Sequence, residues 1–320
     1  MNLSRNLFII LLFWGGFAQA QDSKVNSGII EYEKGNYKKS LEALNQALKH
    51  PSMLKTKNQP RAYYYRSKAW LGAANKALVD RDVTWLTANP KAVLHAYEDC
   101  QQAEKRDNGK WTEEIKAHYS TLRISIMQYG LAGLTTLQRT KDEAQKQEAY
   151  TETMQYFKVA AAIQDNDYVV YDMMAQAESA RKFASKETLT YSKQAIERYH
   201  KHKPTTPDPI FGYAYYRKAL VERYTLEELE TAWNTVRAGI DFLSQERERA
   251  QRMADLKRRE VVIRKMKPVQ KDLERFELDI LLNSPDLRDV ALKKFEKAIQ
   301  DEPTNYNIHL AYASLLPRYH

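Results

Sequence analysis

The chain has 320 residues, with 50 Lys and Arg against 41 Asp and Glu, which leaves a net charge of +9. Its single cysteine, Cys100, excludes an internal disulfide, so packing rather than cross-linking must stabilise the fold. Only ten Gly and ten Pro occur, and abundant Ala, Leu, Glu, Lys, Arg and Gln favour helix almost throughout.

Residues 1–20 have the pattern of a secretory signal peptide. Arg5 precedes the apolar run Leu7–Phe17, and Ala18-Gln19-Ala20 forms an A-x-A cleavage site. The run has 11 residues, fewer than the roughly 20 that a spanning helix needs. We therefore expect a mature chain from Gln21 with net charge +8, periplasmic or secreted if the host is bacterial. No cysteine stands there for a lipid anchor, and no later segment approaches transmembrane length.

Residues 26–51 predict a helical hairpin. Gly28–Tyr32 belongs to its first helix, and the turn lies at 35–37. The second helix follows a small-x3-apolar-x2-small template, and a proline at 51 closes the unit. The template residues are Ser40, Leu44 and Ala47.

The template recurs less regularly up to residue 199. The second hairpin has its first helix at 61–72 and its template match only after residue 95, so we interpret 73–90 as an insertion. The third hairpin spans 112–138 and 141–165. A fourth begins at Tyr171, but its second helix, 186–199, is one residue out of step. The two matches are Ala96, Cys100 and Ala103, and Thr153, Phe157 and Ala160.

A proline-rich loop at 200–209 predicts a hinge between two sets of repeats, 21–203 and 204–320. A fifth hairpin follows, with its first helix at 211–224 and a second helix from 226 that carries Ala232, Val236 and Gly239. No stop signal occurs before Pro268, so we expect this helix to continue as a long charged arm over about 240–267.

The clearest match lies at the C-terminus. Ala291, Phe295 and Ala298 follow the template, and Pro303 closes the sixth hairpin, formed by 269–282 and 285–302. A lone helix at 305–316 then caps the stack. With these repeats the mature chain resembles a tetratricopeptide repeat protein, which implies an all-α, right-handed α-solenoid of helical hairpins whose first helices line a partner-binding groove.

Tyrosines, 21 in all, concentrate on the first helices. In such repeats aromatic and arginine side chains are good contact anchors, although packing between hairpins is the commoner role of a tyrosine. At least one of three consecutive tyrosines at 63–65 must face outward, because successive helical residues point about 100° apart. We assign partner binding to Tyr64, Arg66 and Arg217.

Residues 246–275 contain 11 Lys and Arg against six Asp and Glu, a net charge of +5. This excess suggests an anionic partner, and its alternative is a solvated helix with internal ion pairs. We assign partner binding to Arg258, Arg259 and Arg264. A 4-3-4-3-4 apolar seam from 262 to 280 predicts packing on a neighbouring helix, with Pro268 dividing it into two short helices.

No catalytic, metal or cofactor site is predicted. His200 and His202 lack companion ligands, and Cys100 falls at a core position. Glu178-Ser179 is similar to the catalytic pair of helical lytic transglycosylases, but the glycine-bearing segment that should follow is absent. Common enzyme motifs are absent too.

We therefore predict a non-catalytic interaction scaffold of the bacterial cell envelope that binds a protein or peptide, with no nucleic-acid partner. The basic stretch favours an acidic segment. The alternative is a glycan-binding or glycan-processing envelope protein, whose aromatic clusters stack on sugar rings.

Overall fold

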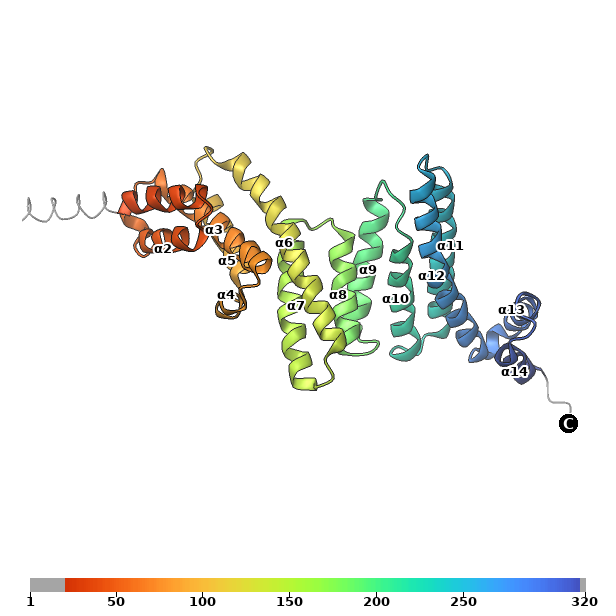
Figure 1. Cartoon of the computed structure of the whole chain (residues 1–320). Helices are drawn as coiled ribbons and strands as arrows, with labels where there is room; N and C mark the ends of the chain where they lie inside the picture. Colours follow the sequence, from red (N-terminus) through yellow and green to blue (C-terminus); the bar gives the residue numbers. More distant parts are fainter. Residues whose placement is uncertain (1–20, 317–320) are drawn as a thin grey trace, which may run out of the picture. The chain divides into compact units, whose positions relative to one another are not determined.

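The computed structural model describes residues 21–316, drawn in colour in Figure 1, which fall into two compact units, 21–129 and 130–316. The predicted signal peptide, 1–20, lies outside the described residues. The helices of the first unit are 21–33, α2 (Tyr37–Ala47), η1 (Pro51–Met53), α3 (Asn58–Asp80), α4 (Val83–Ala88), α5 (Ala92–Arg106) and the first part of α6 (Thr112–Arg139). Those of the second unit are the rest of α6, α7 (Glu143–Ile163), α8 (Tyr168–Arg181), α9 (Lys186–Lys201), η2 (Pro209–Phe211), α10 (Gly212–Tyr224), α11 (Leu229–Gln251), α12 (Leu256–Leu282), η3 (Pro285–Leu287), α13 (Arg288–Asp301) and α14 (Tyr306–Leu315).

Consecutive helices pair into hairpins. In the first unit α3 packs on both α2 and α5, and in the second α8 packs on α7 and α9, while α10 packs on α9 and α11. The second helix of one hairpin thus contacts the first helix of the next, and Figure 1 shows α8 to α12 following one another side by side. This arrangement buries the apolar faces between neighbouring helices, because no single hairpin can cover its own apolar face.

The template residues form that core. Their side chains are fully buried in the first, second and third hairpins, and Ala232, Val236, Ala291 and Phe295 are at most 1% exposed. The small positions allow close approach: Gly28 lies against Leu44, and its carbonyl accepts a hydrogen bond of 2.7 Å from Ser40 Oγ. An all-α fold of consecutive tetratricopeptide-like hairpins is therefore confirmed, and no strand occurs between residues 21 and 316.

The fourth hairpin follows the template more closely than predicted. In α9 the buried residues Thr188, Ser192 and Ala195 have the expected 4-3 spacing, and Tyr199 continues the buried face. The prediction that this helix is out of step was wrong, because a serine occupies the position where we required an apolar side chain. Ser192 is 0% exposed, so a small polar side chain satisfies the packing.

The predicted insertion at 73–90 is helical over most of its length. Ala73, Ala74 and Ala77 extend the buried face of α3, which therefore continues to Asp80. The short α4 follows, and Asp82 caps it by accepting a hydrogen bond of 3.0 Å from the Trp85 amide.

The predicted charged arm at about 240–267 does not exist. Helix α11 ends at Gln251, and α12 begins after Asp255, which accepts a 3.0 Å hydrogen bond from the Arg258 amide. The sequence reading missed this N-cap, since aspartate before a helix satisfies its free amides. Helices α11 and α12 pack together instead.

Pro268 lies inside α12 and does not divide it. Proline removes one helical hydrogen bond, at the carbonyl four residues earlier, that of Arg264. Both Pro268 and Arg264 are exposed, so water can satisfy the freed carbonyl. The apolar seam stays continuous and buried through this point, as its spacing predicted.

The loop at 200–209 is anchored rather than hinge-like. Asp208 accepts a hydrogen bond of 3.0 Å from Tyr168, its amide donates to Glu246 at 2.8 Å, and Pro207 and Pro209 are buried. Arg249 also donates to the Pro204 carbonyl. The division between compact units, after Tyr129, accordingly differs from the boundary predicted between 203 and 204.

The last helix, α14, packs on α13 through Ile308 and Tyr312. Its opposite side exposes Tyr306 by 73% and Leu310 by 57%. A cap for a helical stack needs a polar outer face, so α14 is only an incomplete cap.

Candidate functional site

Helix α12 has two faces of opposite character. The seam Val262, Met266, Val269, Leu273, Phe276 and Ile280 is at most 7% exposed. On the other side, Lys257, Arg264 and Lys271 recur every seven residues and therefore lie almost in line along the helix. Lys267 lies between Arg264 and Lys271 near the same row, and Arg275 extends the row by one turn beyond Lys271.

These five cations form what we name the basic stripe. All five side chains are exposed. Among the described residues they make no ion pair or hydrogen bond through their side chains, although Glu260 and Glu274 lie nearby on the same helix. Glu274 instead accepts a hydrogen bond of 2.7 Å from Gln270. The positive charge of the stripe is therefore available to a partner.

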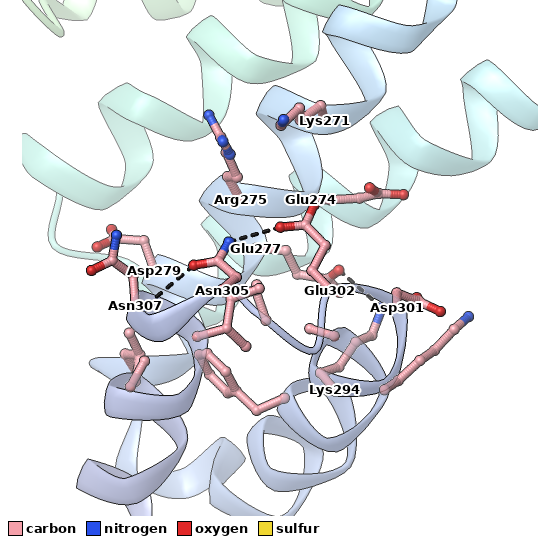
Figure 2. A pocket seen from close by; sticks show the side chains of 17 residues that line it. Lys271, Glu274, Arg275, Glu277, Asp279, Lys294, Asp301, Glu302, Asn305 and Asn307 are labelled. Atoms are coloured by element: carbon pink, nitrogen blue, oxygen red, sulfur yellow. Dashed lines mark hydrogen bonds and ion pairs between the residues drawn. The ribbon is translucent and has the colours of Figure 1, made fainter.

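The stripe leads into a cavity of about 630 Å³ between α12, α13 and α14, here named the end pocket (Figure 2). Lys271 and Arg275 line it from α12, and Asn305 and Asn307 line it from the start of α14. Its apolar lining consists of Leu278, Leu282, Phe295, Ala298, Ile308 and Ala311. The size falls in the range typical of ligand sites, and an apolar floor with a charged rim suits a side chain of a bound peptide.

Part of the polar rim is already paired. Buried Glu277 accepts hydrogen bonds from Lys294 at 2.9 Å and from Trp233 Nε1 at 3.2 Å. Asn305 Nδ2 donates to Glu302 at 2.7 Å, and its Oδ1 caps α14. Figure 2 shows the contacts of Lys294 with Glu277 and of Asn305 with Glu302 and Asn307 on the pocket wall, while Lys271 and Arg275 point away from them. The lining thus holds both signs of charge: Lys271, Arg275 and Lys297 have no side-chain partner among the described residues, and neither has Asp301.

Arg217 does not take the partner-binding position predicted for it. It is 9% exposed, lies on α10 and forms an ion pair with Asp172 of α8. Two tyrosines on α10 also form hydrogen bonds with α12, the first helix of the next hairpin. Tyr213 donates to Asp272 at 2.9 Å, and Tyr224 donates to Asp279 at 3.3 Å. These side chains join first helices to one another and leave little of α10 for a ligand.

Tyr64 and Arg66 also have internal partners. Tyr64 is 7% exposed, packs against Trp111 and Tyr65, and has a pKa raised to about 12 by burial. Arg66 binds Asp99 through two hydrogen bonds of 2.6 and 2.7 Å. Of the three consecutive tyrosines, Tyr65 is the most exposed, which corrects our choice of Tyr64 as the outward residue.

The three arginines predicted on the basic stretch all lie on α12. Arg264 is part of the basic stripe. Arg258 is exposed and donates to Thr206 Oγ1 at 3.3 Å, and Arg259 is half-buried. The structure therefore brings one of the six predicted contact residues into line with the end pocket.

The residues considered for chemistry have structural surroundings. Cys100 is fully buried, as predicted, and burial raises its pKa to about 12. His200 contacts Tyr215 Oη at 2.7 Å, and no cluster of metal-ligating side chains occurs in residues 21–316. Burial alone would raise the pKa of Glu178, but hydrogen bonds from Arg181, Tyr150 and Ser185 lower it.

The end pocket itself was not predicted from the sequence. In the sequence, nothing distinguishes Lys271, Arg275 and Lys297 from the many other charged residues. The pocket that they line forms only where α14 packs on α13. One usable signal existed: the row of cations at seven-residue spacing, opposite an apolar seam.

No protein-family model matches the chain, and no curated protein matches it either. Solved structures similar to it include the TPR2AB-domain:pHSP90 complex of yeast Sti1, at 15% identity over 78% of this chain and 84% of that one, with a TM-score of 0.27. The TPR domain of P58(IPK) shows 13% identity over 92% and 87%, with a TM-score of 0.28. The C-terminal part of a TPR repeat-containing protein from Cytophaga hutchinsonii shows 14% over 90% and 98%, with a TM-score of 0.27. At these scores the fold assignment rests on the hairpin packing described above.

Proposed function

We propose that the chain is a non-catalytic scaffold that binds an acidic segment of a partner protein along the basic stripe and seats an apolar side chain of that segment in the end pocket. The observation that carries this proposal is the row of five unpaired cations on α12 running into a cavity with an apolar floor.

The two parts of the site contribute differently to binding. The apolar floor supplies affinity, because burying one large apolar side chain contributes about 1.5–3 kcal/mol. The exposed cations contribute less per pair, at most about 1 kcal/mol each, but they orient the segment and speed association. A partner segment therefore needs both acidic residues and an apolar anchor.

The proposal extends to location. The pattern of residues 1–20 supports export, and we place the scaffold in the bacterial cell envelope on that basis. Among residues 21–316, no helix has both the length and the hydropathy for a membrane span. A non-catalytic role is supported by the paired state of Glu178 and the burial of Cys100.

The test uses fluorescent peptides and the full mature chain. A glutamate-rich peptide that carries two adjacent leucines should bind, and matched peptides with lysine in place of glutamate, or serine in place of leucine, should bind at least tenfold more weakly. Affinity should fall as salt increases, because exposed charges are screened.

A triple variant, Arg264→Glu with Lys271→Glu and Arg275→Glu, should lose at least tenfold in affinity and most of the salt dependence. The control reverses three exposed lysines elsewhere in the same unit, Lys158, Lys182 and Lys193, which do not line the pocket. Equal losses in the two variants, or binding of the lysine peptide, would overturn the proposal.

A further inference from the structure

A second cavity, of about 530 Å³, lies in the first unit and is here named the N-terminal pocket. Four segments meet there: the helix 21–33, the loop before α3, the start of α3 and the turn before α6. The lining residues are Asp22, Asn26, Lys55, Lys57, Asn58, Arg61, Lys110 and Trp111. Its volume is within the range of small-molecule sites.

The pocket is strongly positive. Four cations line it against one acid, Asp22, which is 8% exposed. Asp22 is occupied, because it accepts a hydrogen bond of 2.8 Å from Asn58 and lies 3.7 Å from Lys55 Nζ. The side chains of Lys57 and Lys110 have no partner among the described residues, and Arg61 uses one nitrogen, which donates to Asn26 at 3.0 Å. At least two full positive charges are therefore left for a ligand.

The turn that supplies Lys110 and Trp111 is held in one conformation. Asp107 accepts hydrogen bonds from the amides of both residues, at 3.1 and 3.0 Å, and from Thr112 Oγ1 at 2.7 Å. Gly109 takes a φ of +96°, which a side chain would rarely allow. The backbone of Lys110 and Trp111 is thus held in place before a ligand arrives, which reduces the entropy lost on binding.

Trp111 gives the pocket an aromatic wall. Its indole is half-buried and packs against Tyr64, with ring centroids 5.5 Å apart, and against Tyr65 at 6.2 Å. These neighbours hold the ring while part of it lines the cavity. An aromatic ring offers a flat apolar surface to a ligand ring, and the amides of Asn26 and Asn58 can exchange hydrogen bonds with hydroxyl groups.

We infer that the N-terminal pocket binds a sugar that carries an anionic group, either a carboxylate or a phosphate. The cations would hold the anion, the indole would pack on the sugar ring, and the asparagine amides would contact its hydroxyls. This inference is independent of the peptide site proposed on α12, because the two pockets share no residue and lie in different units.

Calorimetry on the full mature chain tests the inference with four defined probes: a galacturonate trisaccharide, glucose 6-phosphate, inorganic phosphate and maltotriose. One or both acidic sugars should bind, and comparing them distinguishes a carboxylate from a phosphate ligand. Inorganic phosphate should bind at least tenfold more weakly than the better acidic sugar, because it cannot use the indole. Maltotriose should not bind measurably.

Two variants locate the site. The double variant Lys57→Ala with Lys110→Ala should bind the acidic sugar at least tenfold more weakly. The control, Lys49→Ala with Lys91→Ala, removes two exposed lysines of the same unit outside the pocket and should leave the affinity unchanged. Trp111→Phe keeps an aromatic ring for packing and should weaken the sugar but not inorganic phosphate. Absence of acidic-sugar binding, equal affinity for inorganic phosphate, or equal losses in both lysine variants would overturn the inference.

Discussion

The two compact units both contain aromatic contacts and differ most in the number of their buried carboxylates. In residues 21–129 the contacts between first helices are largely aromatic: Lys68 Nζ lies 4.8 Å from the ring centroid of Tyr32, 5.2 Å from that of Tyr64 and 5.4 Å from that of Tyr65. Burial lowers the pKa of Lys68 and raises that of Tyr64. Ring area and cation-π attraction therefore stabilise this unit.

Residues 130–316 contain ring contacts as well, such as Tyr199 stacked on Phe211, but they also hold most of the buried carboxylates, whereas residues 21–129 have Asp22 and Asp99. Glu178, Glu222, Glu246 and Glu277 are at most 2% exposed, and each accepts a hydrogen bond from a cation. The cation lies on the same helix as the carboxylate for Glu178, Glu222 and Glu246, and only the pair of Glu277 with Lys294 joins two helices, α12 and α13. The comparison shows that the two units use the same kinds of contact in different proportions, and that the charges left unpaired in each unit mark its candidate site.

The largest effect should follow from breaking a buried ion pair of the second unit. Arg217→Met leaves Asp172, which is 6% exposed, without its cation. We expect the second unit to lose about 3–5 kcal/mol, because an unpaired buried charge is costly. Hydrogen exchange read separately over 21–129 and 130–316 measures it. The exposed Arg264→Met is the control, and a loss shared equally by both units would contradict the comparison.

Acid should affect the units at different pH values. In the first unit His118 contacts Ser67 Oγ at 2.8 Å and the ring of Tyr64, and burial together with the charge of Lys68 lowers its pKa to about 4. In the unfolded chain the pKa of His118 is near its ordinary value of about 6.5, so between about pH 4 and about pH 6.5 the unfolded state binds more protons than the folded state. Stability of this unit should fall by about 3 kcal/mol as the pH drops from about 6.5 to about 4.

The second unit should respond only at lower pH. Glu178 has a pKa below its ordinary 4.5, so its contribution is present above 4.5 and is lost as the pH falls further. Exchange protection of each unit between pH 7.5 and 4.5 separates the two behaviours. His118→Leu should remove the pH slope of the first unit, and an unchanged slope would show that other groups cause it.

The smallest effect concerns the start of α12. Asp255→Ala removes the cap of this helix and should cost about 1 kcal/mol, felt mainly in the first turns of α12. Asp241→Ala, at an exposed position inside α11, is the matched control. If exchange near residue 258 is no faster in the capping variant than in the control, the observed break between α11 and α12 has another cause.

Much of the fold followed from spacing. The template identified the second helices around Leu44, Cys100, Phe157, Val236 and Phe295, and these five side chains are at most 1% exposed. The predictions were wrong where a residue type is compatible with two different structural roles. Ser192 filled an apolar position, Pro268 was tolerated on an exposed side, and Asp255 ended the supposed arm as an N-cap.

The candidate sites followed from the sequence far less. Arg66 and Arg217 were chosen as exposed anchors, yet their carboxylate partners lie 33 and 45 residues away along the chain. Arg264, by contrast, is an exposed cation of the basic stripe without a side-chain partner among the described residues, and its role in partner binding stays a prediction. Neither Trp111 nor Arg275 was singled out, since nothing near them in the sequence shows that they line a cavity.

The sequence by itself determined the helical hairpins and their cores, because contacts at three, four and seven residues along a helix are encoded by local spacing. Tertiary structure alone decided which charges remain unpaired and where cavities open. Those properties depend on residues distant in the chain. Asp172 forms an ion pair with Arg217, and the packing of α14 on α13 forms the pocket that Lys271 lines. Burial and partners, rather than residue type, distinguish a structural arginine from one that can hold a ligand.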